Sequence, residues 1–113
     1  MQAVFRRRGG DCLSSISGRI TIDSSPDLRL LLLQTLQSAD CNSLTVDFYD
    51  VTYMDTSGLA VLLEVLRAAR GLKKTFQLSG LREHPRYLLE GTRLLRLFVE
   101  VDREVSNEGF AGR

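Results

Sequence analysis

The stretch Met54-Asp55-Thr56-Ser57-Gly58 separates two hydrophobic patterns in this chain of 113 residues. Before it, residues 44–48 alternate apolar and polar side chains, and residues 51–54 add a second β-branched and aromatic piece. After it, apolar residues recur at helical spacing, at Leu59, Leu62, Leu63, Leu66 and Ala69. The change of period predicts a strand that ends at this stretch and a helix over about 57–70.

Three polar residues therefore stand where the predicted helix begins. A helix N-terminus has unpaired backbone N–H groups and a dipole that favours negative charge. Asp, Thr and Ser are all good N-cap residues, but a helix has one N-cap position, so capping explains only one of Asp55, Thr56 and Ser57. Gly58 would lower helix stability by up to about 1 kcal/mol, so we expect another group to approach the backbone closely there.

The rest of the chain alternates strand and helix patterns. Short strands are predicted at 4–7, at 12–17 with Gly18 ending the run, and at 75–79. Helices are predicted from Ser25 as N-cap with Pro26 at the first helical position, and from Pro85 to about Glu90. Gly71 is predicted as the left-handed cap of the helix at 57–70. Residues 94–101 form a last apolar segment, part turn and part strand or helix, and residues 102–113 are expected to fray.

This order predicts a single α/β domain, with a small mixed or mostly parallel sheet of four to five strands covered by about four helices. On the helix after Pro26, an apolar stripe is expected to pack on the sheet: Leu28, Leu31, Leu32, Thr35 and Leu36. Leu30 and Leu33 lie outside it and either widen the buried face or belong to a subunit interface, which leaves a homo-oligomer open. The arginines at 6–8 are interpreted as a solvated strand edge, with partner binding as the alternative.

Composition narrows the class of protein. With 43% apolar and 26% charged residues, the chain has the composition of a globular domain. Its net charge of +1 gives no strong positive electrostatic field that would favour binding of nucleic acid. The longest apolar run, at 30–33, is far shorter than the roughly 20 residues of a membrane span. No apolar segment of a secretory signal follows the charged residues at 1–8. Cys12 and Cys41 are therefore predicted to be reduced, buried thiols of a cytoplasmic protein.

Catalytic and cofactor motifs are missing from the sequence. It has a single histidine, His84, which cannot complete a metal site, and no phosphate-binding glycine loop or Cys-x-x-Cys pair. Asp47, Asp50 and Asp55 cluster along one strand and its exit, and are interpreted as exposed strand and turn residues, with acid-base chemistry as the alternative. Glu64 and Arg67 are expected to pair on the outer face of their helix. We therefore predict a protein without cofactor or metal that is not an enzyme.

A phosphorylation switch is the functional interpretation of the stretch at 54–58. A phosphate on Thr56 or Ser57 would add nearly two negative charges beside helix N–H donors, which the fold tolerates. Beside Asp55, and facing a partner, the same charge would repel and would cost desolvation energy. Phosphorylation would thus act on binding while leaving the fold intact.

Residues 46–63, VDFYDVTYMDTSGLAVLL, resemble the core signature of STAS domains, specifically the bacterial anti-sigma factor antagonists. Residues 88–98, LLEGTRLLRLF, are similar to the closing segment of that family, and Gly18-Arg19-Ile20 to its early Gly-x-aliphatic turn. The resemblance covers about residues 12–99, which we take as the core of the domain.

The resemblance implies a regulator of transcription that works by partner exchange. Such proteins bind an anti-sigma factor, a Ser/Thr kinase of the GHKL ATPase type, which phosphorylates the hydroxyl residue directly after the Asp, while a phosphatase reverses the reaction. In this sequence that residue is Thr56, with Ser57 as second choice, where the family usually has Ser. An Asp that the family carries three residues after the early Gly is Thr21 here, with Asp23 nearby. The implied partner-binding residues are Asp23, Asp55, Thr56, Ser57, Gly58 and Leu59.

A related branch of the family carries a similar block, Asp-Thr-x-Gly-Leu-Ala, which matches residues 55–60. Its members are STAS subunits of lipid-transporting ABC systems, which dock on an ATPase and have no connection with sigma factors. This branch is the alternative function that the sequence leaves open.

Overall fold

Five strands form one mixed sheet in the computed structural model, which describes residues 1–103. The strands are β1 (Gln2–Arg8), β2 (Asp11–Ile20), β3 (Ser43–Met54), β4 (Thr75–Ser79) and β5 (Val99–Val101). They lie in the order β1-β2-β3-β4-β5. The first pair is antiparallel and the other three pairs are parallel, which confirms the predicted mixed, mostly parallel sheet. The frayed tail predicted for 102–113 falls, from residue 104 onward, outside the described residues.

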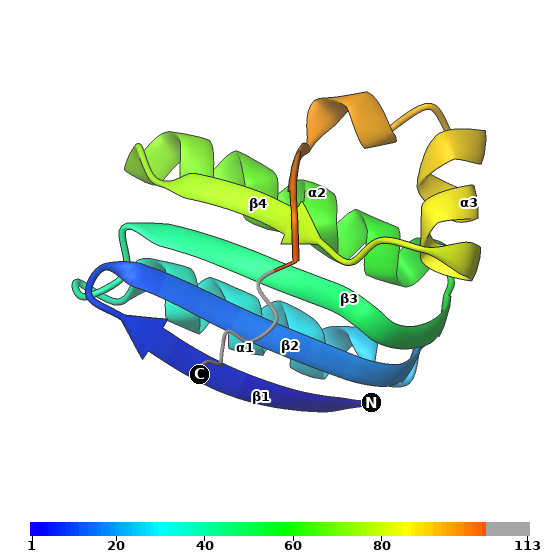
Figure 1. The fold of residues 1–113 in the computed structure, drawn as a ribbon, viewed down its shortest axis with the longest axis horizontal. Helices are drawn as coiled ribbons and strands as arrows, with labels where there is room; N and C mark the ends of the chain where they lie inside the picture. Colours follow the sequence, from blue (N-terminus) through cyan, green and yellow to red (C-terminus); the bar gives the residue numbers. More distant parts are fainter. Residues whose placement is uncertain (104–113) are drawn as a thin grey trace.

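Helices α1 (Ser25–Gln37) and α2 (Thr56–Leu72) lie side by side against one face of the sheet (Figure 1). The shorter helix α3 (Glu83–Gly91) lies at one end of β3 and is followed by the 3₁₀ turn η1 (Leu95–Leu97). Residues 1–103 thus contain three α-helices and one 3₁₀ turn, where the sequence led us to expect about four helices. The opposite face of the sheet carries no long helix (Figure 1).

The core lies between α1, α2 and the sheet, as the apolar spacing predicted. Leu28, Leu32 and Leu36 of α1 are fully buried, and Leu62 and Val65 of α2 meet them from the neighbouring helix. A fully buried aliphatic side chain contributes about 1.5–3 kcal/mol to folding. Leu33 packs partly against this core, whereas Leu30 is 54% exposed. The prediction that these two leucines widen the buried face of the helix is therefore confirmed for Leu33 and wrong for Leu30. A role of Leu30 in a subunit interface stays a prediction.

Two strands are longer than the sequence predicted. Gly18 does not end β2, because its positive φ of 89° lets the strand continue through a shift in register to Ile20. β3 continues through Tyr49 and Asp50 as one strand of 12 residues, since its pairing with β2 absorbs an irregularity there. β1 is exposed along its whole length, in agreement with a solvated edge, and Arg7 pairs with Asp40 at 2.9 Å.

Helix ends also differ from the prediction. The N-cap of α1 is Ser24, not Ser25, and its hydroxyl makes no capping bond but accepts the Thr21 N–H at 2.9 Å. Helix α2 continues past Gly71, and Lys73 takes the left-handed conformation with φ of 59°. The ammonium group of the next residue, Lys74, donates hydrogen bonds to two carbonyl oxygens at the end of α1, at 2.6 and 2.9 Å. These bonds join the C-terminal end of α2 to that of α1. The C-cap of α2 is therefore Lys73, two residues after the predicted Gly71.

The outer faces of α1 and α2 are joined by an ion pair that the sequence analysis missed. Arg29 donates two hydrogen bonds to the Glu64 carboxylate, at 2.7 and 2.6 Å. The Glu64 carboxylate is thus bound by a bidentate guanidinium from the adjacent helix, and Arg67 on its own helix adds a weaker charge interaction. The contact with Arg29 holds the pKa of Glu64 below its usual value.

Candidate functional site

Asp55 is the N-cap of α2 and organises the predicted site. Its backbone is extended, and one carboxylate oxygen, Oδ1, accepts hydrogen bonds from the Ser57 N–H at 2.9 Å and from the Ser57 hydroxyl. The other oxygen, Oδ2, accepts from the Ile22 N–H at 3.1 Å. These donors, with the Ser57 hydroxyl as the strongest, hold the pKa of Asp55 below its usual value, so it is ionised at neutral pH.

The two candidate acceptor hydroxyls differ in their surroundings. The Ser57 hydroxyl is occupied, because it donates to Asp55 inside the cap. Thr56 is the first residue of α2, its side chain is exposed, and it makes no side-chain hydrogen bond within residues 1–103. Thr56 is thus the accessible hydroxyl at this helix start. The difference could not be read from the sequence, because either residue could have served the cap.

The loop between β2 and α1 lies against this helix start. The Asp55 N–H donates to the Ile20 carbonyl oxygen at 3.0 Å, and the Asp55 carboxylate in turn holds the Ile22 N–H. Ile22 itself is 72% exposed, and Asp23 beside it is also exposed. The structure therefore brings the loop that carries Asp23 next to Thr56, although the two are far apart in sequence.

Gly58 and Leu59 lie under the site, facing the core. A Cβ atom at Gly58 would stand 2.7 Å from Ile20 Cγ2 and 2.7 Å from Met54 Cγ, which confirms the close approach predicted from the sequence. Leu59 is 5% exposed. Both residues position the first turn of α2 against the sheet. A direct contact of either with a partner stays a prediction.

His84 supports the site and was missed by sequence reasoning. Its Nδ1 accepts the Met54 N–H at 3.2 Å, and its ring stacks on Tyr53 at 4.4 Å between centroids. The Arg19 guanidinium lies over the other ring of this stack, 4.3 Å from the Tyr53 centroid. His84 thus ties the start of α3 to the end of β3, just before Asp55. The only signal in the sequence was its place before Pro85, which suggested a surface or capping role.

The aspartates of β3 do not form an acid-base pair. Asp47 is 4% exposed, so its interpretation as an exposed strand residue is wrong. Its carboxylate accepts hydrogen bonds from the Ser79 hydroxyl and from Arg103 Nε, both at 3.0 Å, and these donors make its burial tolerable. Asp50 is exposed, in agreement with the prediction. Within the described part of the chain, no group of three His, Cys, Asp or Glu residues could hold a metal ion.

Cys12 and Cys41 are both buried and unpaired, as predicted. Burial, with a smaller contribution from the neighbouring Cys12, raises the pKa of the Cys41 thiol to about 11. The thiolate is the reactive form, so Cys41 is chemically inert at neutral pH.

A family model described as "Mlab, STAS domain" matches residues 4–100 of the chain. Similar solved structures include an anti-sigma factor antagonist from Mycobacterium paratuberculosis, with a TM-score of 0.78, 19% identity and coverage of 88% of this chain and 83% of that one. The phosphorylated form of the Bacillus cell fate determinant SpoIIAA has a TM-score of 0.74, 12% identity and coverage of 94% and 95%. A form of RsbS from Moorella thermoacetica has a TM-score of 0.71, 20% identity and coverage of 91% and 88%.

At these identities the structural matches establish the α/β fold. In residues 1–103, no helix combines the length and the apolar character that a membrane span needs.

Proposed function

The chain belongs to the STAS domain family, and on that premise we propose that it is a bacterial anti-sigma factor antagonist. In this proposal it binds a cognate anti-sigma factor, a Ser/Thr kinase of the GHKL ATPase type, in the cytoplasm. Phosphorylation of Thr56 by that kinase ends the binding, and a phosphatase restores it. The chain itself supplies a surface and an acceptor hydroxyl and performs no catalysis.

The observation that carries this proposal is the contrast between Thr56 and Ser57. The Ser57 hydroxyl is held by Asp55, whereas Thr56 presents an exposed hydroxyl at the first position of α2. A kinase needs an accessible hydroxyl that can enter its active site without unfolding the substrate. The helix start meets this need at Thr56 only.

Charge explains how such a modification would switch binding. A phosphate on Thr56 adds close to two negative charges beside the N–H groups of the first turn, where the helix dipole is favourable. Asp55 is ionised next to it, and the exposed Asp23 belongs to the loop that Asp55 holds. The surface would thus become strongly acidic while the fold stayed intact. A partner that accepts the unmodified surface would meet repulsion and added desolvation.

The test is phosphorylation by the cognate anti-sigma kinase, sought among the neighbouring genes, with the phosphate located by mass spectrometry. We expect phosphate on Thr56 in the wild type and none in Thr56→Ala. The matched control Ser57→Ala should still be phosphorylated, because Ser57 only serves the cap. Phosphate on another residue alone, or none at all, would contradict the proposal.

Binding and stability are measured on the same proteins. Thr56→Asp should weaken binding of the purified kinase by tenfold or more, which corresponds to about 1.4 kcal/mol, with little change in melting temperature. Calorimetry and thermal unfolding monitor the two effects separately. If Thr56→Asp unfolds the protein instead, the stretch is only a structural cap.

Two observations favour a second function: the description of the family model, and the sequence Asp-Thr-Ser-Gly-Leu-Ala at residues 55–60. In that case the same surface docks on the ATPase of a lipid-transporting ABC system. Purified chain would then form a stable complex with such an ATPase and none with an anti-sigma kinase. Thr56→Asp would still weaken the complex, so the identity of the partner separates the two functions.

A further inference from the structure

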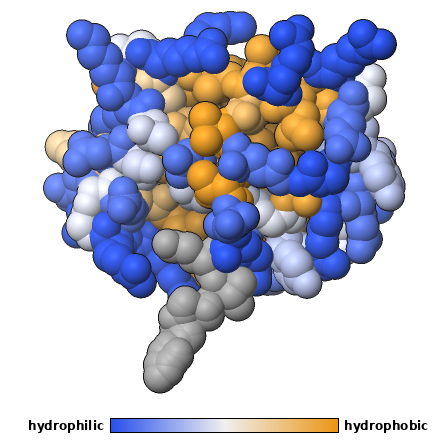
Figure 2. Space-filling view, turned by 45° about the horizontal axis from the view of Figure 1, so that its top comes forward, coloured by the Kyte–Doolittle hydropathy of each residue, from blue (hydrophilic) through white to orange (hydrophobic). Residues whose placement is uncertain are grey.

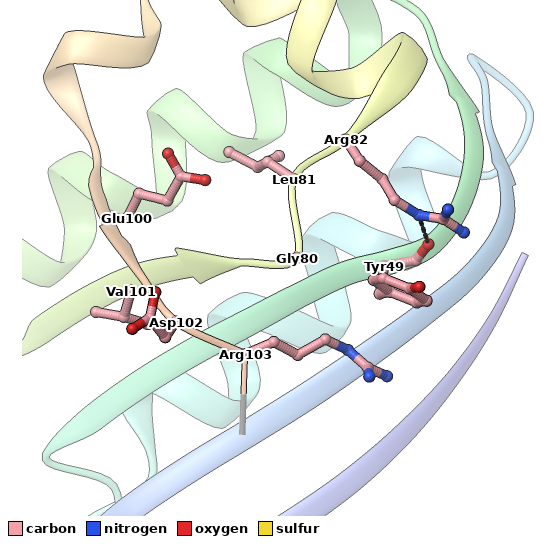
Figure 3. A pocket seen from close by; sticks show the side chains of 8 residues that line it. All are labelled: Tyr49, Gly80, Leu81, Arg82, Glu100, Val101, Asp102 and Arg103. Carbon is pink, nitrogen blue, oxygen red and sulfur yellow. Dashed lines mark hydrogen bonds between the residues drawn. The ribbon is translucent and has the colours of Figure 1, made fainter. Parts of the chain in front are cut away.

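A pocket of about 490 Å³ opens at the ends of β4 and β5. Its walls are the Tyr49 ring, the segment after β4 and the segment after β5 (Figure 3). The volume falls in the range of about 300–1,000 Å³ that is typical of small-molecule sites. The proposed switch at Thr56 uses none of the residues that line this pocket, so a ligand could bind here whether or not that switch exists.

Two guanidinium groups stand over the same aromatic ring in this pocket. The guanidinium carbon of Arg82 lies 3.9 Å from the Tyr49 ring centroid, and that of Arg103 lies 4.3 Å from it. Arg82 and Arg103 approach Tyr49 from different elements, one from the segment before α3 and the other from the segment after β5 (Figure 3). The negative face of the ring attracts each of these cations.

Both arginines are anchored through their Nε atoms. Arg82 Nε donates to the Tyr49 carbonyl oxygen at 2.8 Å, and Arg103 Nε donates to the buried carboxylate of Asp47 at 3.0 Å. Asp47 therefore balances Arg103. Within the described residues, the one ion pair of Arg82 is with Glu83, at 3.4 Å, and the Glu83 side chain is 73% exposed. Anchoring through Nε orients both groups, and within residues 1–103 only Arg82 Nη1 among their outer nitrogens has a hydrogen-bond partner, Glu83.

The remaining walls limit what an anion at these arginines can carry. Leu81 is buried, Val101 is half-buried, and with the Tyr49 ring they give the pocket an apolar side. Glu100 is paired with Arg86, and Asp102 is exposed at the other end of the pocket. The Asp102 carboxylate disfavours a second anionic group. The pocket thus fits one anionic group joined to a compact apolar body better than a polyanion.

Figure 2 shows that apolar surface gathers in the middle of one face of the molecule, between hydrophilic side chains that surround it. On the segment between α3 and β5, Leu94, Leu95 and Leu97 are only half-buried, and Val99 is 54% exposed.

We propose that this pocket binds a small organic phosphate monoester, with its phosphate on Arg82 and Arg103 and its apolar body against Tyr49, Leu81 and Val101. The ligand would join the segment before α3 to the end of β5. His84 of α3, two residues after Arg82, accepts the Met54 N–H, so the segment before α3 is joined to the end of β3 that precedes Asp55.

Binding is tested by titrating the full-length, unphosphorylated chain with phenyl phosphate and following backbone amide NMR signals. We expect saturable shifts at Tyr49, Gly80 and Arg82 at submillimolar concentration. Arg82→Gln should weaken binding about tenfold, because a charge-assisted contact is lost. The control Arg93→Gln removes the same charge from an exposed position outside the pocket and should leave the affinity unchanged. Arg82 is exposed, and a native spectrum of Arg82→Gln establishes that the variant is folded.

Two further probes separate the sources of the binding energy. Inorganic phosphate should bind at least tenfold more weakly than phenyl phosphate, because it lacks the apolar body. ATP should also bind more weakly, because its additional charges meet Asp102. The proposal is overturned by the absence of shifts at millimolar phenyl phosphate, by equal losses in Arg82→Gln and Arg93→Gln, or by tighter binding of either probe.

Discussion

Replacing Gly58 by alanine should destabilise the protein, although alanine is the better helix former. Gly58 lies in the first turn of α2 and is buried. In an open position of a helix, a change from glycine to alanine raises the free energy of unfolding by about 0.5–1 kcal/mol. At Gly58 the added methyl group has no space, so packing opposes the gain in helix propensity.

The size of the effect follows from the contacts of the added atom. Its Cβ would lie 2.7 Å from Ile20 Cγ2, 2.7 Å from Met54 Cγ and 3.0 Å from Met54 Sδ. Ile20 and Met54 are both fully buried, and the β-branched side chain of Ile20 is stiff. Overpacking of this kind costs about 1–3 kcal/mol. After the gain in propensity is subtracted, we expect Gly58→Ala to lower the free energy of unfolding by about 1 kcal/mol, the middle of a range of about 0–2.5 kcal/mol.

Gly71 provides the matched control in the same helix. A Cβ atom at Gly71 would meet nothing within 4 Å, so Gly71→Ala should raise the free energy of unfolding, by up to about 1 kcal/mol. Urea unfolding followed by circular dichroism measures both variants. The two substitutions are predicted to have opposite signs. A Gly58→Ala variant that is as stable as Gly71→Ala would refute the reasoning, and would mean that Met54 moves aside without cost.

Two further predictions concern charged groups around the site. Because the pKa of Asp55 is lower in the folded protein than in the unfolded chain, its ionisation stabilises the fold above about pH 4, and this contribution is lost as the pH falls through the lower folded value. The stability difference between wild type and Asp55→Asn, measured by urea unfolding, should therefore be largest at neutral pH and shrink below pH 4, and a constant difference would contradict it. Arg29→Gln and Glu64→Gln, combined in a double-mutant cycle, should show a small favourable coupling that falls with added salt, because the pair is exposed. A coupling independent of salt would show that charge is not its cause.

The start of α2 at Asp55 shows which structural features the local sequence can predict. The change from alternating to helical spacing predicted the end of β3 and the beginning of α2 to within one residue. The residue types at 55–58 also predicted that only one of the three polar side chains caps the helix and that another group approaches the backbone of Gly58 closely. Which hydroxyl stays exposed was not predictable, because Thr56 and Ser57 are equally good hydrogen-bond donors in isolation.

Contacts between distant segments account for the errors. Asp47 carries a charge on a strand, which usually means exposure, yet Ser79 and Arg103 come from distant parts of the chain to bind it. Glu64 is bound by Arg29 on the neighbouring helix, and Arg67 on its own helix adds only a weaker charge interaction. Neither partner lies within the window over which sequence periodicity carries information.

Local sequence patterns were enough to predict the α/β class, the order of the strands and helices along the chain, the apolar stripe of α1 and the location of the polar stretch at the start of α2. These features depend on side chains a few residues apart, which share one periodic backbone. The folded chain was needed to establish that Ile22 holds the Asp55 carboxylate, that Ser57 is occupied while Thr56 is exposed, and that two arginines meet on Tyr49. Those contacts join residues as many as 54 positions apart in sequence, Tyr49 and Arg103, and they form only when the sheet brings its strands into register.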